Sequence, residues 1–172
     1  LFHGVVDKQD IYESYKWKHI EKDTFQKVVE IYKNKKNSTI FSFDDAYKNC
    51  FESCKYLIKN NFSVSIAVPT SRVGTNYYWN DEIEFYFLNN PRHFIFLNNT
   101  KFNLSNVQNK ISSLENFKSI IRSLNLDKQE KLINKIKEDK IFWENKIMPQ
   151  KSNIMNYEEL NTLKNLGVNL VH

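Results

Sequence analysis

The chain has 172 residues, of which 41% are hydrophobic, and its formal net charge is +5. This length and composition suit one domain with a buried core and exclude an intrinsically disordered chain. No apolar run is long enough to span a membrane, so no transmembrane segment is expected. The positive charge raises the question of a nucleic-acid partner. Arginine occurs only at Arg72, Arg92 and Arg122, and the lysines are interspersed with acidic residues as on solvated helix faces. We therefore expect no nucleic acid as a partner.

The first part of the chain alternates predicted strands with predicted helices. Strand-forming residues occupy positions 2–6, 39–43 and 62–68. Apolar residues at helical spacing predict one helix that begins after Thr24 as its N-cap and another over residues 47–60. Strands and helices in this order predict an α/β fold with parallel strands and right-handed crossovers.

The middle of the chain departs from this alternation. Residues 93–104 predict two short strands around the turn Asn98-Asn99-Thr100, and helices are expected over 108–124 and 127–138. We interpret residues 74–150, approximately, as a helical and hairpin insertion in a single domain that spans residues 1–172.

The regular pattern returns near the end of the chain. Asn156 and Glu159 predict a capping box for a helix through Leu166, and Gly167 is the expected C′ residue. A strand over residues 168–171 then leads to His172. The chain begins at Leu1 rather than methionine, and its first residues already predict a strand. Its last residue stands where a site residue is expected, because ligands of α/β folds bind at the carboxyl ends of the strands. We therefore expect the chain to be truncated at both ends.

Two cysteines, Cys50 and Cys54, would lie on one face of a helix. No further cysteine or nearby histidine completes a metal-binding set, so we predict small, reduced core residues.

Asp44 and Asp45 follow the strand over residues 39–43 directly, and this is the most informative stretch of the sequence. Adjacent carboxylates at the end of a buried strand are costly unless a metal ion or a proton transfer uses them. Aspartate is also a favoured N-cap, and on this dipeptide alone both interpretations stay open.

Several segments together resemble the polysaccharide deacetylases, the NodB-homology family of carbohydrate esterases. Phe41-Ser42-Phe43-Asp44-Asp45-Ala46-Tyr47 resembles the family's Thr-Phe-Asp-Asp-Gly-Tyr motif. Four further segments resemble family stretches in the right order: Leu1-Phe2-His3-Gly4-Val5, residues 62–70, Tyr77-Tyr78-Trp79-Asn80-Asp81-Glu82-Ile83, and residues 156–170, which lead toward the second metal motif.

The resemblance implies a fold, an activity and roles for particular residues. The fold would be the N-terminal part of an irregular (β/α) barrel, and the activity would be metal-dependent removal of an acyl group, usually N-acetyl, from an amino sugar or surface polysaccharide. Asp45 and His172 would bind a divalent metal, with Zn²⁺ as the default and cobalt or nickel also compatible. Asp44 would be the general base that takes a proton from the attacking water. His3 would lie in the same mouth and contact the acylated glycan substrate.

The sequence also departs from the family pattern. Ala46 replaces the usual glycine, which would strain the turn if its φ is positive. His172 is either the first metal-binding histidine after a one-residue deletion or the residue just before it, and both assignments stay open. These departures motivate an alternative function, a degenerate, non-catalytic glycan-binding domain on the same fold.

The remaining expectations concern other histidines, one aromatic residue and the compartment. His19 and His93 match no family motif, and we expect them to be structural or exposed. Trp79 and Asp81 could form part of a substrate wall, although packing of the insertion is the expected role of Trp79. The compartment stays open between the cell envelope and the cytoplasm of a bacterium.

Overall fold

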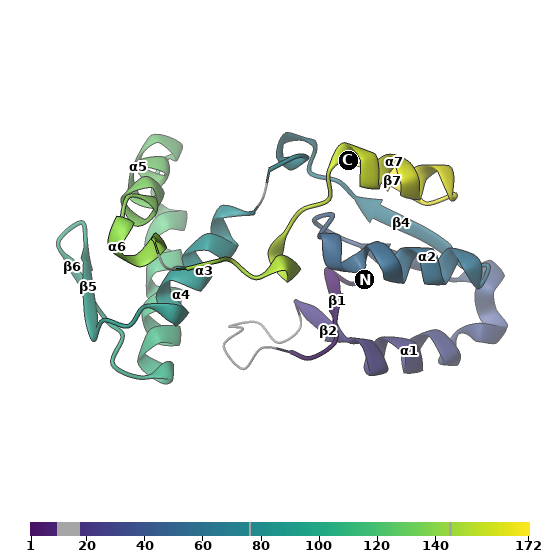
Figure 1. Ribbon diagram of the computed structural model, residues 1–172, viewed down its shortest axis with the longest axis horizontal. Coiled ribbons are helices and arrows are strands. Elements are labelled where there is room, and N and C mark those ends of the chain that lie inside the picture. Colours follow the sequence, from purple (N-terminus) through teal and green to yellow (C-terminus); the bar gives the residue numbers. More distant parts are fainter. Residues whose placement is uncertain (10–17, 76, 145) are drawn as a thin grey trace. The chain divides into compact units, whose positions relative to one another are not determined.

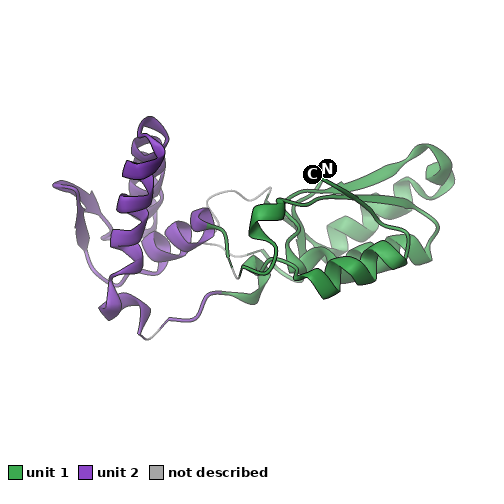
Figure 2. Cartoon of the chain, turned by 90° about the horizontal axis from the view of Figure 1, so that it is seen from above, with its two compact units in different colours: residues 1–78, 149–172 green, residues 79–148 purple. Residues whose placement is uncertain are grey.

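The structure, a computed structural model, describes residues 1–9, 18–75, 77–144 and 146–172 (Figure 1). It divides into two compact units (Figure 2). Unit 1 comprises Leu1–Tyr78 and Pro149–His172, and unit 2 comprises Trp79–Met148. Unit 2 falls within the range predicted for the insertion, and the fold is of the mixed α/β class.

Unit 1 contains a parallel sheet in the order β3 (Ile40–Phe43), β4 (Ser63–Ala67) and β7 (Asn169–Val171). This confirms the predicted parallel pairing. β1 (Gly4–Val6) and β2 (His19–Glu21) form a second parallel pair, and β2 was not predicted. The described strands form these small sheets without closing into a barrel.

A single parallel bridge between Phe2 and Phe43 joins the start of β1 to β3. The Phe2 amide donates to the Ser42 carbonyl at 2.8 Å, and the Asp44 amide donates to the Phe2 carbonyl at 2.8 Å. Because β3, β4 and β7 run in the same direction, their carboxyl ends meet at one edge of unit 1, and the bridge places Phe2 and His3 beside the end of β3.

Three α-helices and four short 3₁₀-helices complete the described part of unit 1: α1 (Lys22–Ile31), α2 (Phe51–Lys59), α7 (Tyr157–Asn165), η1 (Lys33–Ser38), η2 (Lys48–Cys50), η3 (Thr70–Arg72) and η4 (Gln150–Ser152). The prediction that Thr24 caps α1 was wrong. The N-cap is Glu21, because β2 keeps this residue extended and the chain turns directly into the helix at Lys22.

The capping box of α7 is confirmed, since Asn156 and Glu159 exchange side-chain to backbone hydrogen bonds. Gly167 has a φ of 100°, a conformation that suits glycine at the C′ position.

The core of unit 1 lies where the sheet packs on its helices. Phe43 and Ile66 from the strands, Leu57 from α2 and Leu163 from α7 are all fully buried. Cys50 and Cys54 are buried in the same cluster and are not bonded to each other, as predicted. The hydrogen bond with Cys50, together with burial, raises the pKa of the Cys54 thiol, so this thiol stays protonated.

Unit 2 has its own core and its own small hairpin. Its elements are α3 (Trp79–Asn89), β5 (Phe94–Leu97), β6 (Thr100–Asn103), α4 (Val107–Ser123), α5 (Leu126–Lys137) and α6 (Lys140–Trp143). The predicted hairpin is confirmed: β5 and β6 are antiparallel, and Asn98 and Asn99 between them both have positive φ. Buried aromatic side chains such as Phe87, Phe102 and Phe117 pack together beneath it.

Asp139, Arg92 and Tyr86 form a hydrogen-bonded network in unit 2. The Asp139 carboxylate accepts hydrogen bonds from the Arg92 guanidinium and, at 2.7 Å, from the Tyr86 hydroxyl. Within the described ranges of both units, no helix combines the length and apolar character needed to cross a membrane.

Candidate functional site

The turn that carries Asp44 and Asp45 lies at the carboxyl end of β3. Asp45 has a φ of 68° and Ala46 a φ of 50°, so two consecutive non-glycine residues are left-handed. Each costs about 1–2 kcal/mol, and strain of this kind persists only where the surroundings over-determine it. Ala46 was expected to strain the turn if its φ is positive, and its φ is indeed positive.

Contacts from distant parts of unit 1 hold this turn in place. The Tyr78 hydroxyl donates to the Asp45 carbonyl at 2.6 Å. On the other side, the Met155 amide donates to the Ala46 carbonyl at 2.9 Å, and the Ala46 side chain is fully buried. The Tyr78 ring also packs edge-on against Tyr47, with 5.4 Å between the ring centroids. The turn is thus fixed by its surroundings rather than by its own conformational preference.

His3 lies beside Asp45. Its Nδ1 atom is 3.1 Å from Oδ2 of Asp45, and the two side chains are 22% and 43% exposed, respectively. In the tautomer with a proton on Nδ1, this atom donates a hydrogen bond to the carboxylate. In the other tautomer, Nδ1 and Oδ2 are close enough to bind one metal ion together. The sequence predicted that His3 lies at the same site as the two carboxylates and contacts the substrate. Its pairing with Asp45 was not predicted.

Asp44 is the other carboxylate of the turn. Its amide is held by the bridge to Phe2, and its side chain is partly buried at the same edge. The structure therefore brings His3, which precedes β1, beside Asp44 and Asp45, which follow β3.

His172 lies at the same edge but farther along the sheet. It follows Val171, which pairs with Ala67 of β4, and it is exposed. β7 is separated from β3 by β4, so the backbones of His172 and Asp45 stand two strand spacings apart, about 10 Å. In the described part of the chain, no three His, Cys, Asp or Glu side chains gather closely enough to hold an ion by themselves.

The other residues singled out from the sequence occupy different surroundings. His19 is buried and packs against the Tyr47 ring, whereas His93 is exposed. Asp81 is buried in the first turn of α3, and Trp79 packs against the core of unit 2, the role expected for it.

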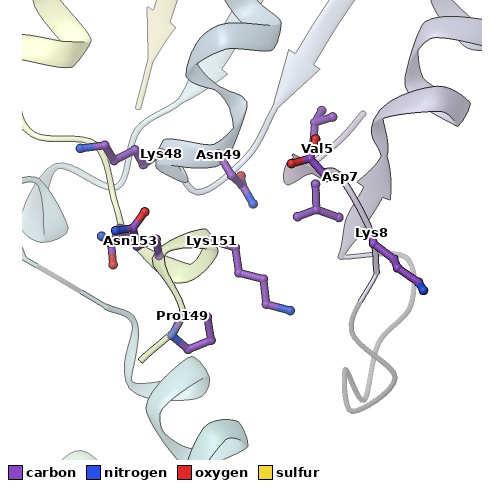
Figure 3. Close-up of a pocket in the computed structure, with 10 residues that line it drawn as sticks. Val5, Asp7, Lys8, Lys48, Asn49, Pro149, Lys151 and Asn153 are labelled. Carbon is purple, nitrogen blue, oxygen red and sulfur yellow. The ribbon is translucent and has the colours of Figure 1, made fainter. Parts of the chain in front are cut away.

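A cavity of about 640 Å³ opens in unit 1 (Figure 3). Its lining comes from β1 and the two residues after it, from η2, and from the segment that precedes α7. Its lining residues are mostly polar: Val5, Val6, Asp7, Lys8, Lys48, Asn49, Pro149, Gln150, Lys151 and Asn153. Sequence reasoning missed this cavity because residues 149–153 reach it only through tertiary contacts. One of these contacts is the hydrogen bond from the Lys48 amide to the Asn153 carbonyl at 2.8 Å.

Comparison of the chain with protein-family models, with curated proteins and with solved structures gives no match.

Proposed function

We propose that this chain belongs to a metal-dependent hydrolase that removes an acyl group, N-acetyl in the simplest case, from an amino sugar or a surface polysaccharide. The observation that carries the proposal is the pair His3–Asp45 beside Asp44, on a strained turn at the carboxyl edge of a parallel sheet. Ligands of open α/β folds bind at this edge. The motif order of the polysaccharide deacetylases supports the same conclusion, with the irregular (β/α) barrel of that family as the proposed complete fold.

The donor atoms at this turn fit a divalent ion such as Zn²⁺. Nitrogen and carboxylate oxygen ligands lie about 2.0–2.2 Å from zinc, so two ligands of one ion stand about 3 Å apart. The 3.1 Å between Nδ1 of His3 and Oδ2 of Asp45 meets this condition. We propose Asp45, His3 and His172 as the residues that hold the ion. This gives His3 a ligand role in addition to the substrate contact expected from the sequence.

The proposed reaction divides the work between the adjacent carboxylates. A bound zinc-like ion supplies polarisation of the amide carbonyl and lowers the pKa of water. Asp44 accepts a proton from the attacking water as the water oxygen bonds to the acyl carbon. The C–N bond then breaks, and the proton passes to the amine nitrogen of the sugar. The backbone beside Asp44 is fixed by the hydrogen bond of its amide with the Phe2 carbonyl and by the hydrogen bond from Tyr78 to the Asp45 carbonyl, which would support the separate roles of the two carboxylates.

Two single substitutions test this division. Asp45→Asn keeps a residue that tolerates the left-handed conformation, so the turn is expected to survive. We expect this loss of a metal-binding carboxylate to weaken Zn²⁺ binding at least tenfold in titration calorimetry. It should also abolish acetate release from N-acetylglucosamine oligomers. Asp44→Asn should leave Zn²⁺ affinity unchanged and lower turnover by about 10²–10⁴-fold. Unchanged Zn²⁺ affinity in the Asp45→Asn variant would contradict the metal-binding role of Asp45. Full activity in the Asp44→Asn variant would contradict the role of Asp44 as the base.

The second candidate function is a glycan-binding domain without catalysis. The specific observation that favours it is the polar cavity beside the turn, whose lining needs no metal to bind a sugar. Sugar binding that survives metal removal, combined with no acetate release, would select this function over hydrolysis.

A further inference from the structure

Two asparagine side chains in the lining of the cavity have polar atoms without partners. Both the Nδ2 and the Oδ1 atoms of Asn49 are buried and make no hydrogen bond with any described residue, and the same is true of Oδ1 of Asn153. A buried polar atom without a partner costs about 1–3 kcal/mol. Three such atoms around one cavity therefore indicate groups kept for a ligand rather than for stability.

The two asparagines come from segments that are far apart in the sequence but locked together in the structure. Asn49 follows the carboxylate turn within η2, and Asn153 precedes the bridge between Tyr47 and Ile154. The Lys48–Glu159 ion pair, 2.7 Å long, links η2 to α7 as well. Figure 3 shows Asn49 and Lys151 extending toward the space in the middle of the cavity, whereas Lys48 extends away from it. The backbone of the lining is thus held by contacts that do not use the asparagine side chains.

The inventory of unpartnered atoms defines the chemistry of the ligand. Asn49 offers one amide donor group and one acceptor, and Asn153 offers a second acceptor. An anion supplies acceptors alone and would leave both carbonyl oxygens unpartnered. A hydroxyl group both donates and accepts, so a hydroxyl-rich ligand satisfies all three atoms. A cavity of about 640 Å³ lies within the range that accommodates small ligands.

We infer that this cavity is a binding subsite for an uncharged sugar unit, held by the side-chain amides of Asn49 and Asn153 without a metal ion. The inference rests on the proposed function in one respect, since the sugar would be a neighbouring unit of the glycan whose acyl group lies at Asp45. To reach the ligand, the Asn49 amide turns about its side-chain bonds, away from its packing position against Gly4.

The test measures sugar binding directly. The chain is labelled with ¹⁵N, freed of metal with a chelator and titrated with an N-acetylglucosamine trimer, while the side-chain amide signals of Asn49 and Asn153 are followed. Both signals are expected to shift, and Asn49→Ala is expected to weaken binding roughly tenfold, as for a lost hydrogen-bonding group. Asn161→Ala, an exposed position on α7, is the matched control and should bind like the parent chain.

Thermal unfolding separates a ligand-binding role from a structural one. Because Asn49→Ala removes two buried, unpartnered atoms, its melting temperature should equal or exceed that of the parent chain while sugar binding falls. A lowered melting temperature with intact sugar binding would make Asn49 a packing residue and overturn the inference. Inorganic phosphate that shifts these signals when the sugar does not would overturn it too, in favour of an anion site.

Failure of the hydrolase proposal is distinguishable from failure of this inference. Asp45→Asn should retain sugar binding at the asparagines whether or not the chain binds Zn²⁺. Zn²⁺ binding and acetate release without any shift of the asparagine signals would reject the subsite alone.

Discussion

The side chain of Asn49 lies in the space that a side chain at position 4 would occupy. A Cβ atom built on Gly4 would overlap Oδ1 of Asn49 and would lie 2.6 Å from its Cγ and Nδ2 atoms. Gly4 does not need a positive φ, so the glycine is explained by this close approach. β1 and η2 therefore pack closely against each other at the pair Gly4 and Asn49.

Gly4→Ala should accordingly destabilise the chain by about 1–3 kcal/mol, the usual cost of overpacking. Without the clash, alanine in a strand interior would be favoured over glycine by about 0.5–1 kcal/mol. Asn49→Ala in the same chain should restore most of the loss, and urea unfolding of the two single variants and the double variant gives the coupling energy. Strictly additive effects would show that the two residues do not compete for this space.

The left-handed turn at Ala46 predicts a strong dependence on the shape of the side chain. Ala46→Val should cost at least about 2 kcal/mol, because a β-branched residue is an outlier at positive φ and the site is fully buried. Ala46→Gly should stay within about 1 kcal/mol of the parent chain, since relief of strain is offset by a lost methyl group and a freer unfolded chain. Ala67→Val in β4 is the control, because strands favour valine. Equal costs at positions 46 and 67 would contradict a strained turn.

Tyr78→Phe removes the hydroxyl that donates to the Asp45 carbonyl but keeps the ring that packs on Tyr47. We expect a loss of about 1–2 kcal/mol in the free energy of unfolding, because a partly buried carbonyl loses its donor. The neighbouring substitution Tyr77→Phe should change stability by less than about 0.5 kcal/mol, as is usual away from such contacts. A Tyr78→Phe chain as stable as the Tyr77→Phe chain would show that the hydroxyl does not hold the turn.

The Asp139 network predicts a pH dependence for unit 2. The hydrogen bond from the Arg92 guanidinium lowers the pKa of the Asp139 carboxyl below its ordinary value of 3.8, and the Tyr86 hydroxyl acts in the same direction. Because the folded-state pKa is the lower one, this contribution is present above the unfolded-state pKa and is lost as pH falls through the folded-state value.

Asp139→Asn should therefore lower the stability of unit 2 by about 1–3 kcal/mol at neutral pH, with little effect at about pH 2. Urea unfolding at both pH values measures the difference. Glu130→Gln, at an exposed position of α5, serves as the control, and a loss of equal size at both pH values would rule out the charged network as the cause.

Several parts of the fold that follow from local sequence were predicted correctly, although the N-cap of α1 was not. The alternation of strands and helices predicted the parallel pairing of β3 with β4. The Asn98-Asn99 turn predicted the hairpin of β5 and β6. β2 has only three residues, too few to show a period. α3 was missed because its buried residues, from Asp81 to Leu88, include adjacent aromatic and aliphatic positions and lack a single apolar stripe.

The carboxylate turn could be found from the sequence because its two aspartates are adjacent. Its partners could be found only in part. Placing His3 near the carboxyl edge needed only the family resemblance, but its contact with Asp45 depends on the bridge between Phe2 and Phe43. The cavity residues from 149 to 153 return to unit 1 after a 70-residue excursion through unit 2, and no local pattern signals such a long-range contact.

The separate cores of the two units have a consequence for how this sequence can change over evolutionary time. Buried residues of unit 1 support the carboxylate turn, whereas those of unit 2 pack around Phe87, Phe102 and Phe117. Substitutions in residues 79–148 can therefore accumulate, and the hairpin and its helices can drift or be replaced, without repacking the residues beneath Asp44 and Asp45. The buried residues of unit 1 have less freedom, because they belong to the same cluster as Ala46 of the turn.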